Sequence, residues 1–234
     1  QKTSERPVLF TGRRYFGTGT ARDINGLGFQ PDLVWTKSRN VAYTHGLHDS
    51  VRGPNNILRA DVNNAEDAGN TGTHQSLTSF NSDGFSAGQD DDIGCINYTD
   101  KTYIAWTWKA GGAPSGTLAG DGATASLTNG VGNGTIHQNA TGVSGVTSIT
   151  QSVNQNSGFS ITKYTGGGGA TASFPHNLGG TPDWIIIKNL DEARSWVVWH
   201  KDLTNATNSD NNVYKLWLDL NAPQYNATSG QHDH

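Results

Sequence analysis

The sequence contains no methionine and a single cysteine, and both scarcities narrow what the chain can be. The lone Cys95 excludes an intrachain disulfide, so a small secreted scaffold stapled by disulfides is ruled out. Because there is no initiator methionine, we expect the chain to be a segment of a longer polypeptide. No apolar run approaches the roughly 18 residues of a membrane span, and we therefore expect no membrane insertion.

Charge is also scarce. Charged residues make up 15% of the 234 residues, and the formal net charge is -4. No cluster of lysine and arginine stands out, so the electrostatic footprint of a nucleic-acid-binding protein is missing. Hydrophobic residues make up 33%, and 30 glycines accompany abundant threonine, asparagine and serine. This composition is typical of an all-β protein with many turns.

One motif occurs twice. Leu27-Gly-Phe-Gln-Pro-Asp-Leu-Val-Trp-Thr-Lys37 returns as Leu178-Gly-Gly-Thr-Pro-Asp-Trp-Ile-Ile-Ile-Lys188. Proline fixes the backbone where a strand begins and no ladder donor is needed, so each copy reads as a turn feeding a strand. A repeat of about 150 residues is far longer than a solenoid period and indicates two successive domains.

The repeat divides the chain into a first β-sandwich domain at residues 1–110, a stretch at 111–146 and a second β-sandwich domain at 147–234. The middle stretch is rich in Gly, Ala, Thr and Asn, and we expect a linker or an ornamented loop with weak short strands. The second domain ends before any counterpart of the hairpin expected at residues 75–88 or of the strand at 102–109. We therefore expect the second sandwich to be incomplete, truncated at its C-terminus.

The strongest strand signal is the alternating stretch at residues 102–109. Its alternation puts small and large side chains on opposite faces. Because large aromatic residues bury the most area, we expect the core face to hold Ile104, Trp106 and Trp108.

Several of these strands together resemble a known family. The segments are residues 158–166, Pro182-Asp-Trp-Ile-Ile-Ile-Lys188, Trp196-Val-Val-Trp-His200 and Tyr103-Ile-Ala-Trp106. They resemble repeated domains in virion proteins of tailed bacteriophages, those of marine and cyanobacterial phages most of all. Such domains occur in tail fibres and other appendages and are similar to concanavalin A-like or laminin G-like lectin jelly rolls. The resemblance covers about residues 7–110 and 147–220, and it implies no catalytic residues.

The resemblance implies an all-β fold of tandem antiparallel jelly-roll sandwiches on the surface of a virion. Its expected partners are other virion proteins, further copies of the chain and a bacterial surface glycan. We expect a structural component of a tail or head fibre whose lectin-like domains attach to the host. A purely structural decoration or spacer module is one alternative, and a glycan-degrading enzyme is another.

An enzyme is not expected, because hydrolysis of a glycoside needs two carboxylates flanking the bond. The Glu-x-Asp-x-x-Glu signature of glucanases is absent, and the glutamates Glu5, Glu66 and Glu192 all lie in loop-like stretches.

Four residues are candidates for sugar contact. Trp196 and Trp199 could stack on a sugar ring. They stand three apart on an expected strand, so they should face opposite ways and one should be accessible; the alternative is that both belong to the core. Asp49 and Arg52 stand three apart in a turn, where a charge-assisted hydrogen bond could lock the loop or the pair could contact a ligand.

Asp90, Asp91 and Asp92 place three carboxylates in one loop. Calcium prefers such hard oxygen ligands, yet the spacing matches no EF-hand loop. A Ca²⁺ site and a solvated acidic loop are both open, and no other cofactor is expected.

Overall fold

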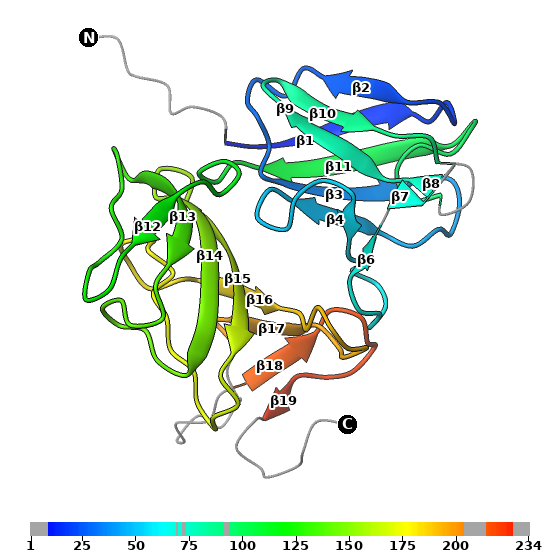
Figure 1. Cartoon of the computed structure of the whole chain (residues 1–234). Coiled ribbons are helices and arrows are strands. Elements are labelled where there is room, and N and C mark those ends of the chain that lie inside the picture. Colours follow the sequence, from blue (N-terminus) through cyan, green and yellow to red (C-terminus); the bar gives the residue numbers. More distant parts are fainter. Residues whose placement is uncertain (1–8, 69, 72–73, 91–93, 204–213, 227–234) are drawn as a thin grey trace, which may run out of the picture.

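The computed structural model describes residues 9–68, 70–71, 74–90, 94–203 and 214–226. Every regular element in these residues is a β-strand, and no helix occurs among them. Figure 1 shows the strands in three groups: a sandwich at the upper right, a sheet at the left and a smaller sheet below them. The protein is therefore all-β, as its composition predicts.

The first layer of the first sandwich has the order β1-β11-β3-β4. Its strands are β1 (Phe10–Phe16), β3 (Leu33–Ser38), β4 (Gly46–Asp49) and β11 (Thr102–Trp108). The last of these in sequence, β11, inserts between β1 and β3 and is antiparallel to both. The layer is therefore complete only when β11 has inserted, and β11 begins more than sixty residues after β3 ends. Such pairing between distant parts of the chain is highly non-local.

The second layer has the order β2-β10-β9. Its strands are β2 (Arg22–Asn25), β9 (Leu77–Asn81) and β10 (Gly84–Ala87), and β9 and β10 form the expected hairpin. Short pairs flank the sandwich: β5 (Asn56–Ile57) with β6 (Asp67–Ala68), and β7 (Asn70–Thr71) with β8 (His74–Gln75). Side chains of both layers meet in one buried core, which includes Tyr15, Ile24, Val34, Leu77, Phe85 and Tyr103.

The two faces of β11 are opposite to our expectation. Its inward side chains, all fully buried, are Tyr103, Ala105 and Thr107, and its half-buried outward ones are Ile104, Trp106 and Trp108. The prediction that the large residues form the core is wrong because the Tyr103 ring already fills the interior, stacked 5.3 Å from Tyr15. The outward rings pack on other aromatic side chains instead, as Trp106 does on Trp35 at 6.1 Å.

The middle sheet has the order β12-β13-β14-β15 and is antiparallel except for the parallel pair β12–β13. Its strands are β12 (Thr117–Ala119), β13 (Val131–Ile136), β14 (Val146–Asn154) and β15 (Phe159–Gly166). The stretch at 111–146 thus carries β12 and β13, and both join the same sheet as the strands that follow it. Phe174 and Leu178, from the segment leading to β16, pack on the core of this sheet.

The last sheet has the order β16-β17-β18-β19. Its strands are β16 (Trp184–Ile187), β17 (Val197–His200), β18 (Tyr214–Trp217) and β19 (Tyr225–Asn226). In the repeat, β16 corresponds to β3. Within the described residues no strand of this sheet is a counterpart of β11. That the second sandwich is truncated stays a prediction.

A shared core joins the two copies of the repeat. Leu47 and Leu58 of the first copy are buried together with Trp196 of the second, and Ile186 packs against them. The last sheet therefore packs with one face against the outer face of the β3–β4 pair. Figure 1 shows this sheet below the first sandwich.

Candidate functional site

Arg52 is the centre of a buried ion network beside β4. Its Nε lies 2.5 Å from Asp49 Oδ2, and its Nη1 lies 2.9 Å from Glu66 Oε2. Its Nη2 donates to the carbonyl oxygen of Leu47 at 3.0 Å. Burial acts to lower the pKa of Arg52, but the Asp49 and Glu66 carboxylates outweigh it and the pKa lies above its ordinary value. The guanidinium is therefore held charged inside the protein.

Asp49 completes this network. Its Oδ1 accepts the backbone N–H groups of Val51 and Arg52 at 3.0 and 2.9 Å. The side chains of Asp49 and Arg52 are only 6% and 4% exposed. Since their polar atoms bond to groups within the protein, we assign both a structural role in place of a glycan contact.

Trp196 and Trp199 do lie on opposite faces. Trp196 is buried in the shared core, and its Nε1–H lies 3.1 Å from each of the carbonyl oxygens of Arg59 and Val62. No sugar can stack on it there, and we assign it to packing between the copies. Trp199 is half-buried on the other face, opposite its cross-strand partner Ile185.

We call that other face of the last sheet the open face. The strand register places five apolar side chains on it: Ile185, Ile187, Val197, Trp199 and Trp217. Ile185 and Ile187 are 39% and 45% exposed. A sugar needs amide or carboxylate partners for its hydroxyls beside any ring it stacks on. The same alternation places Lys215 on this face, with its ammonium 4.5 Å from the centroid of the Trp217 ring. A face with five apolar side chains and one ammonium group suits another protein segment better than a glycan.

Asp90 holds a turn. Its Oδ1 accepts the N–H of Gly94 at 2.8 Å, and its Oδ2 accepts those of Ile96 and Asn97 at 3.0 Å each. The carboxylate is buried and already bonded to three backbone donors. Asp91 and Asp92 lie outside the described residues, so the Ca²⁺ site stays a prediction. Among the residues that the structure does describe, no group of three or more His, Cys, Asp or Glu side chains is placed to hold a metal ion.

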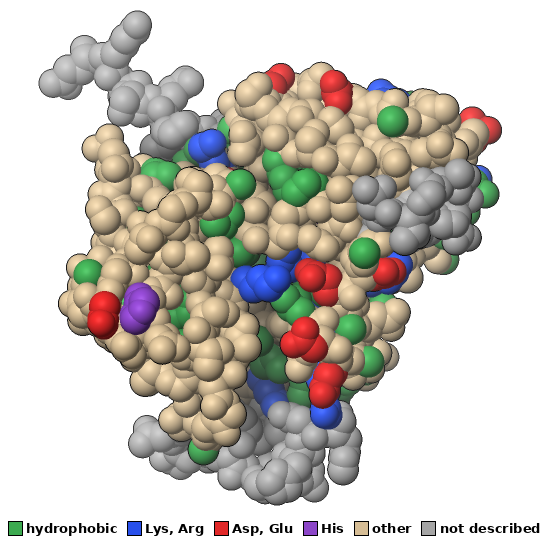
Figure 2. Space-filling model, in the orientation of Figure 1, with side chains coloured by type: hydrophobic (Ala, Val, Ile, Leu, Met, Phe, Trp, Pro, Cys, Tyr) green, Lys and Arg blue, Asp and Glu red, His purple; other side chains and the backbone are tan. Residues whose placement is uncertain are grey.

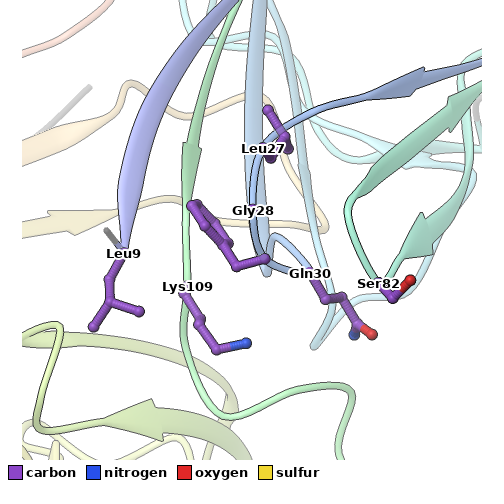
Figure 3. A pocket seen from close by; sticks show the side chains of 7 residues that line it. Leu9, Leu27, Gly28, Gln30, Ser82 and Lys109 are labelled. Atoms are coloured by element: carbon purple, nitrogen blue, oxygen red, sulfur yellow. The ribbon is translucent and has the colours of Figure 1, made fainter. Parts of the chain in front are cut away.

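An open hollow of about 690 Å³ lies at one end of the first sandwich. Its lining comes from separate segments of the chain: Leu9, Leu27, Gly28, Phe29, Gln30, Ser82 and Lys109. Figure 3 shows the Lys109 amino group and the Gln30 amide on the same side of this hollow. It therefore combines apolar walls with a cation, an amide and a hydroxyl.

Asp83 fixes the loop that forms one wall of the hollow. Its two carboxylate oxygens accept the N–H groups of Gly28 at 2.6 Å and Gly26 at 3.0 Å, and these bonds lower the pKa of Asp83. Both glycines have positive φ, 80° and 89°, a conformation that other residues rarely adopt. The Leu-Gly element of the repeat is thus a preformed turn.

No motif in the sequence points to the hollow. Its one available signal is the difference between the two copies, which have Phe29-Gln30 in the first and Gly180-Thr181 in the second. The two copies share most of the surrounding motif but differ at these two positions, and Phe29 and Gln30 line the hollow.

His48 and Cys95 are further buried titratable side chains of the first sandwich. Burial, together with the charges of Arg52 and Arg59, lowers the pKa of His48 to about 3. Burial also raises the pKa of the Cys95 thiol. Both groups are fully buried and neutral near neutral pH, so they offer solvent neither a base nor a thiolate.

Figure 2 shows a surface that is mostly neutral, with acidic and basic side chains gathered where the first sandwich meets the last sheet. In the part of the chain described, no helix is long and apolar enough to cross a membrane. The fold and these surfaces define an all-β protein built of sandwich-like layers, with a hollow on one copy and an apolar face on the other.

The chain matches the family described as Domain of unknown function (DUF7483) twice, over residues 8–148 and over residues 129–233. The two matches together span nearly all of the chain, and the protein belongs to this family. Their overlap, residues 129–148, contains β13 and the start of β14. No curated protein and no solved structure matches the chain.

Proposed function

We propose that the chain is a β-sandwich building block of a tailed-phage virion appendage, and that its first sandwich binds a bacterial surface glycan in the hollow. The tandem sandwiches and the phage-like repeat motifs support the appendage setting. The observation that carries glycan binding is the lining of the hollow, in which apolar walls adjoin Gln30, Ser82 and Lys109.

This lining suits a sugar for chemical reasons. Leucine side chains can cover the apolar face of a sugar ring, while an amide and a hydroxyl can bond to its hydroxyl groups. The Lys109 ammonium favours a sugar that carries a carboxylate or phosphate. The glycan class is therefore an acidic envelope polysaccharide.

The residues that line the hollow also favour glycan binding over glycan hydrolysis. A glycosidase needs a pair of carboxylates flanking the scissile bond, and none of the seven lining residues is acidic. A purely structural spacer module is the alternative, favoured by the apolar open face.

The test is binding of the purified protein to an array of bacterial envelope polysaccharides, with adsorption blocking on host cells as the second readout. We expect Gln30→Ala and Lys109→Ala each to weaken binding about tenfold, because each removes one polar contact. Lys163→Ala, on the exposed surface of β15, is the control and should bind like the wild type.

Absence of binding to any host polysaccharide would remove the glycan role and leave the structural one. Equal binding by all three variants would place the sugar elsewhere on the protein. Location of the chain in intact particles, at a tip or along a shaft, separates an attachment module from a spacer.

A further inference from the structure

The two copies of the repeat differ at one edge. In the first copy β3 lies between β11 and β4, whereas in the second its counterpart β16 pairs only with β17 among the described strands. We call the unpaired side of β16 the open edge. A row of unpaired backbone groups at such an edge is a template for another strand.

Equivalent side chains of β3 and β16 differ in how exposed they are to solvent. Val34 and Thr36 of β3 are 0% exposed, while their counterparts Ile185 and Ile187 of β16 are 39% and 45% exposed. The repeat motif aligns these positions without a gap. The second copy therefore presents to solvent the side chains that the first copy buries.

The backbone of β16 is turned correctly for a further strand. Alternate residues of an antiparallel strand point their N–H and C=O groups to opposite sides. The N–H of Lys201 on the β17 side bonds to the carbonyl of Asp183, so residues 183, 185 and 187 face β17. The N–H and C=O groups of Trp184 and Ile186 consequently face the open edge.

The first copy has the same arrangement with the edge filled. The N–H of Arg39 bonds to the carbonyl of Thr102, so the odd-numbered residues of β3 face β11. Leu33 and Trp35 are therefore bonded toward β11, and they align with Trp184 and Ile186 in the repeat. The backbone N–H and C=O groups of these two motif positions therefore face β11 in the first copy and the open edge in the second.

We propose that the open edge of β16 binds an antiparallel strand of the β11 type, supplied by another repeat of the same family. Such pairing is β-strand addition, in which main-chain bonds give affinity and side-chain pockets give specificity. The first copy supplies the template, because β11 occupies the equivalent edge there. The open edge is on a different sheet from the glycan hollow, so the two proposals fail separately.

The register of the added strand follows from that template. In the first copy Trp106 pairs with Trp35, and Thr107 pairs with Val34. In the second copy the corresponding residues of the incoming strand lie opposite Ile186 and Ile185. The small residues of a β11-type strand, an alanine and a threonine, then cover the exposed isoleucines of the open face.

A synthetic peptide of residues 101–109, which carries a lysine at each end, is the probe. We expect it to bind the 234-residue protein and to slow amide hydrogen exchange at Trp184 and Ile186. Calorimetry gives the affinity, and exchange measured by NMR gives the position.

Backbone N-methylation of the peptide supplies a matched control. In the first copy Ile104 and Trp106 face β3 with their N–H groups, whereas Ala105 and Thr107 face β1. Methylation of the first pair should abolish binding, and methylation of the second pair should leave it unchanged. Neither change alters the protein, so misfolding cannot mimic the result.

A pair of protein variants tests the other side of the contact. Trp184→Pro removes the edge-facing N–H without touching the bonds to β17, and Trp184→Ala removes the same exposed ring but keeps that N–H. We expect the proline variant to bind the peptide about tenfold more weakly than the alanine variant, as fits the loss of one backbone bond.

Equal affinity of the two methylated peptides for the protein would overturn the proposal. Peptide binding that does not slow amide exchange at Trp184 and Ile186 would overturn it as well. Self-association that Trp184→Pro abolishes, with no peptide binding, would show that the edge pairs with a different strand of a second copy of the chain, and it would also overturn the proposal of a β11-type strand.

Discussion

Acidification should destabilise the protein through His48. This side chain is fully buried on β4, and both ring nitrogens lack a hydrogen-bond partner among the described residues. Burial, with Arg52 and Arg59 nearby, lowers its pKa from 6.5 to about 3. The folded protein thus keeps the ring neutral over a pH range in which the unfolded chain protonates it.

The size of the effect follows from this difference. The unfolded state takes up the proton first as pH falls, so the full stability is present above about pH 6.5 and is lost progressively toward about pH 3. At about pH 5 the loss is about 2 kcal/mol, and its limit below pH 3 is about 5 kcal/mol, from 1.36 kcal/mol per pKa unit.

The assay is urea denaturation at about pH 7.5 and about pH 5, for the wild type and for His48→Gln, whose amide does not titrate. We expect the wild type to lose about 2 kcal/mol more than this variant over that interval. His48→Leu is a second neutral replacement, and His137→Gln, which alters an exposed histidine, should behave like the wild type. An identical pH dependence in the wild type and both His48 variants would refute the reasoning.

Three further predictions concern stability and are checked by the same denaturation assay. Arg52→Met should lower the unfolding free energy by about 3–5 kcal/mol because it leaves the buried Asp49 carboxylate and the partly buried Glu66 carboxylate without their cation. Arg194→Ala, in an exposed pair, should cost less than about 1 kcal/mol, and similar losses for the two variants would contradict the buried network. Asp32→Ala should cost about 1–3 kcal/mol, since the buried Asp32 carboxylate accepts the backbone N–H of Ala110 at 2.7 Å. Asp183 is its counterpart in the second copy and is exposed, so Asp183→Ala should cost less than about 0.5 kcal/mol. Trp196→Phe should cost about 1–3 kcal/mol because two carbonyls in the shared core lose their donor, and no change would count against that core.

The strands were predictable because their signals are local. The Pro-Asp entry turns and the alternation at residues 102–109 are visible within ten residues, and β3, β16 and β11 lie where these patterns indicate. The inward face of β11 was not predictable, because it depends on Tyr15, which the sandwich brings against Tyr103 from more than eighty residues away.

The candidate sites were less predictable for the same reason. Asp49 and Arg52 are close in sequence, but the burial of the pair depends on Glu66, which a loop folds over it. Trp196 is buried only because the two copies pack together around it. The hollow draws Leu9 and Lys109 from opposite ends of the first domain, and no sequence spacing reports that meeting.

Amide hydrogen exchange of the dilute protein tests most directly whether the second copy is an open version of the first. The account predicts slow exchange for Leu33 and Trp35, whose N–H groups bond to β11, and fast exchange for their counterparts Trp184 and Ile186 at the open edge. Exchange at Trp184 and Ile186 as slow as at Leu33 and Trp35 would contradict it, because that edge would then already be paired.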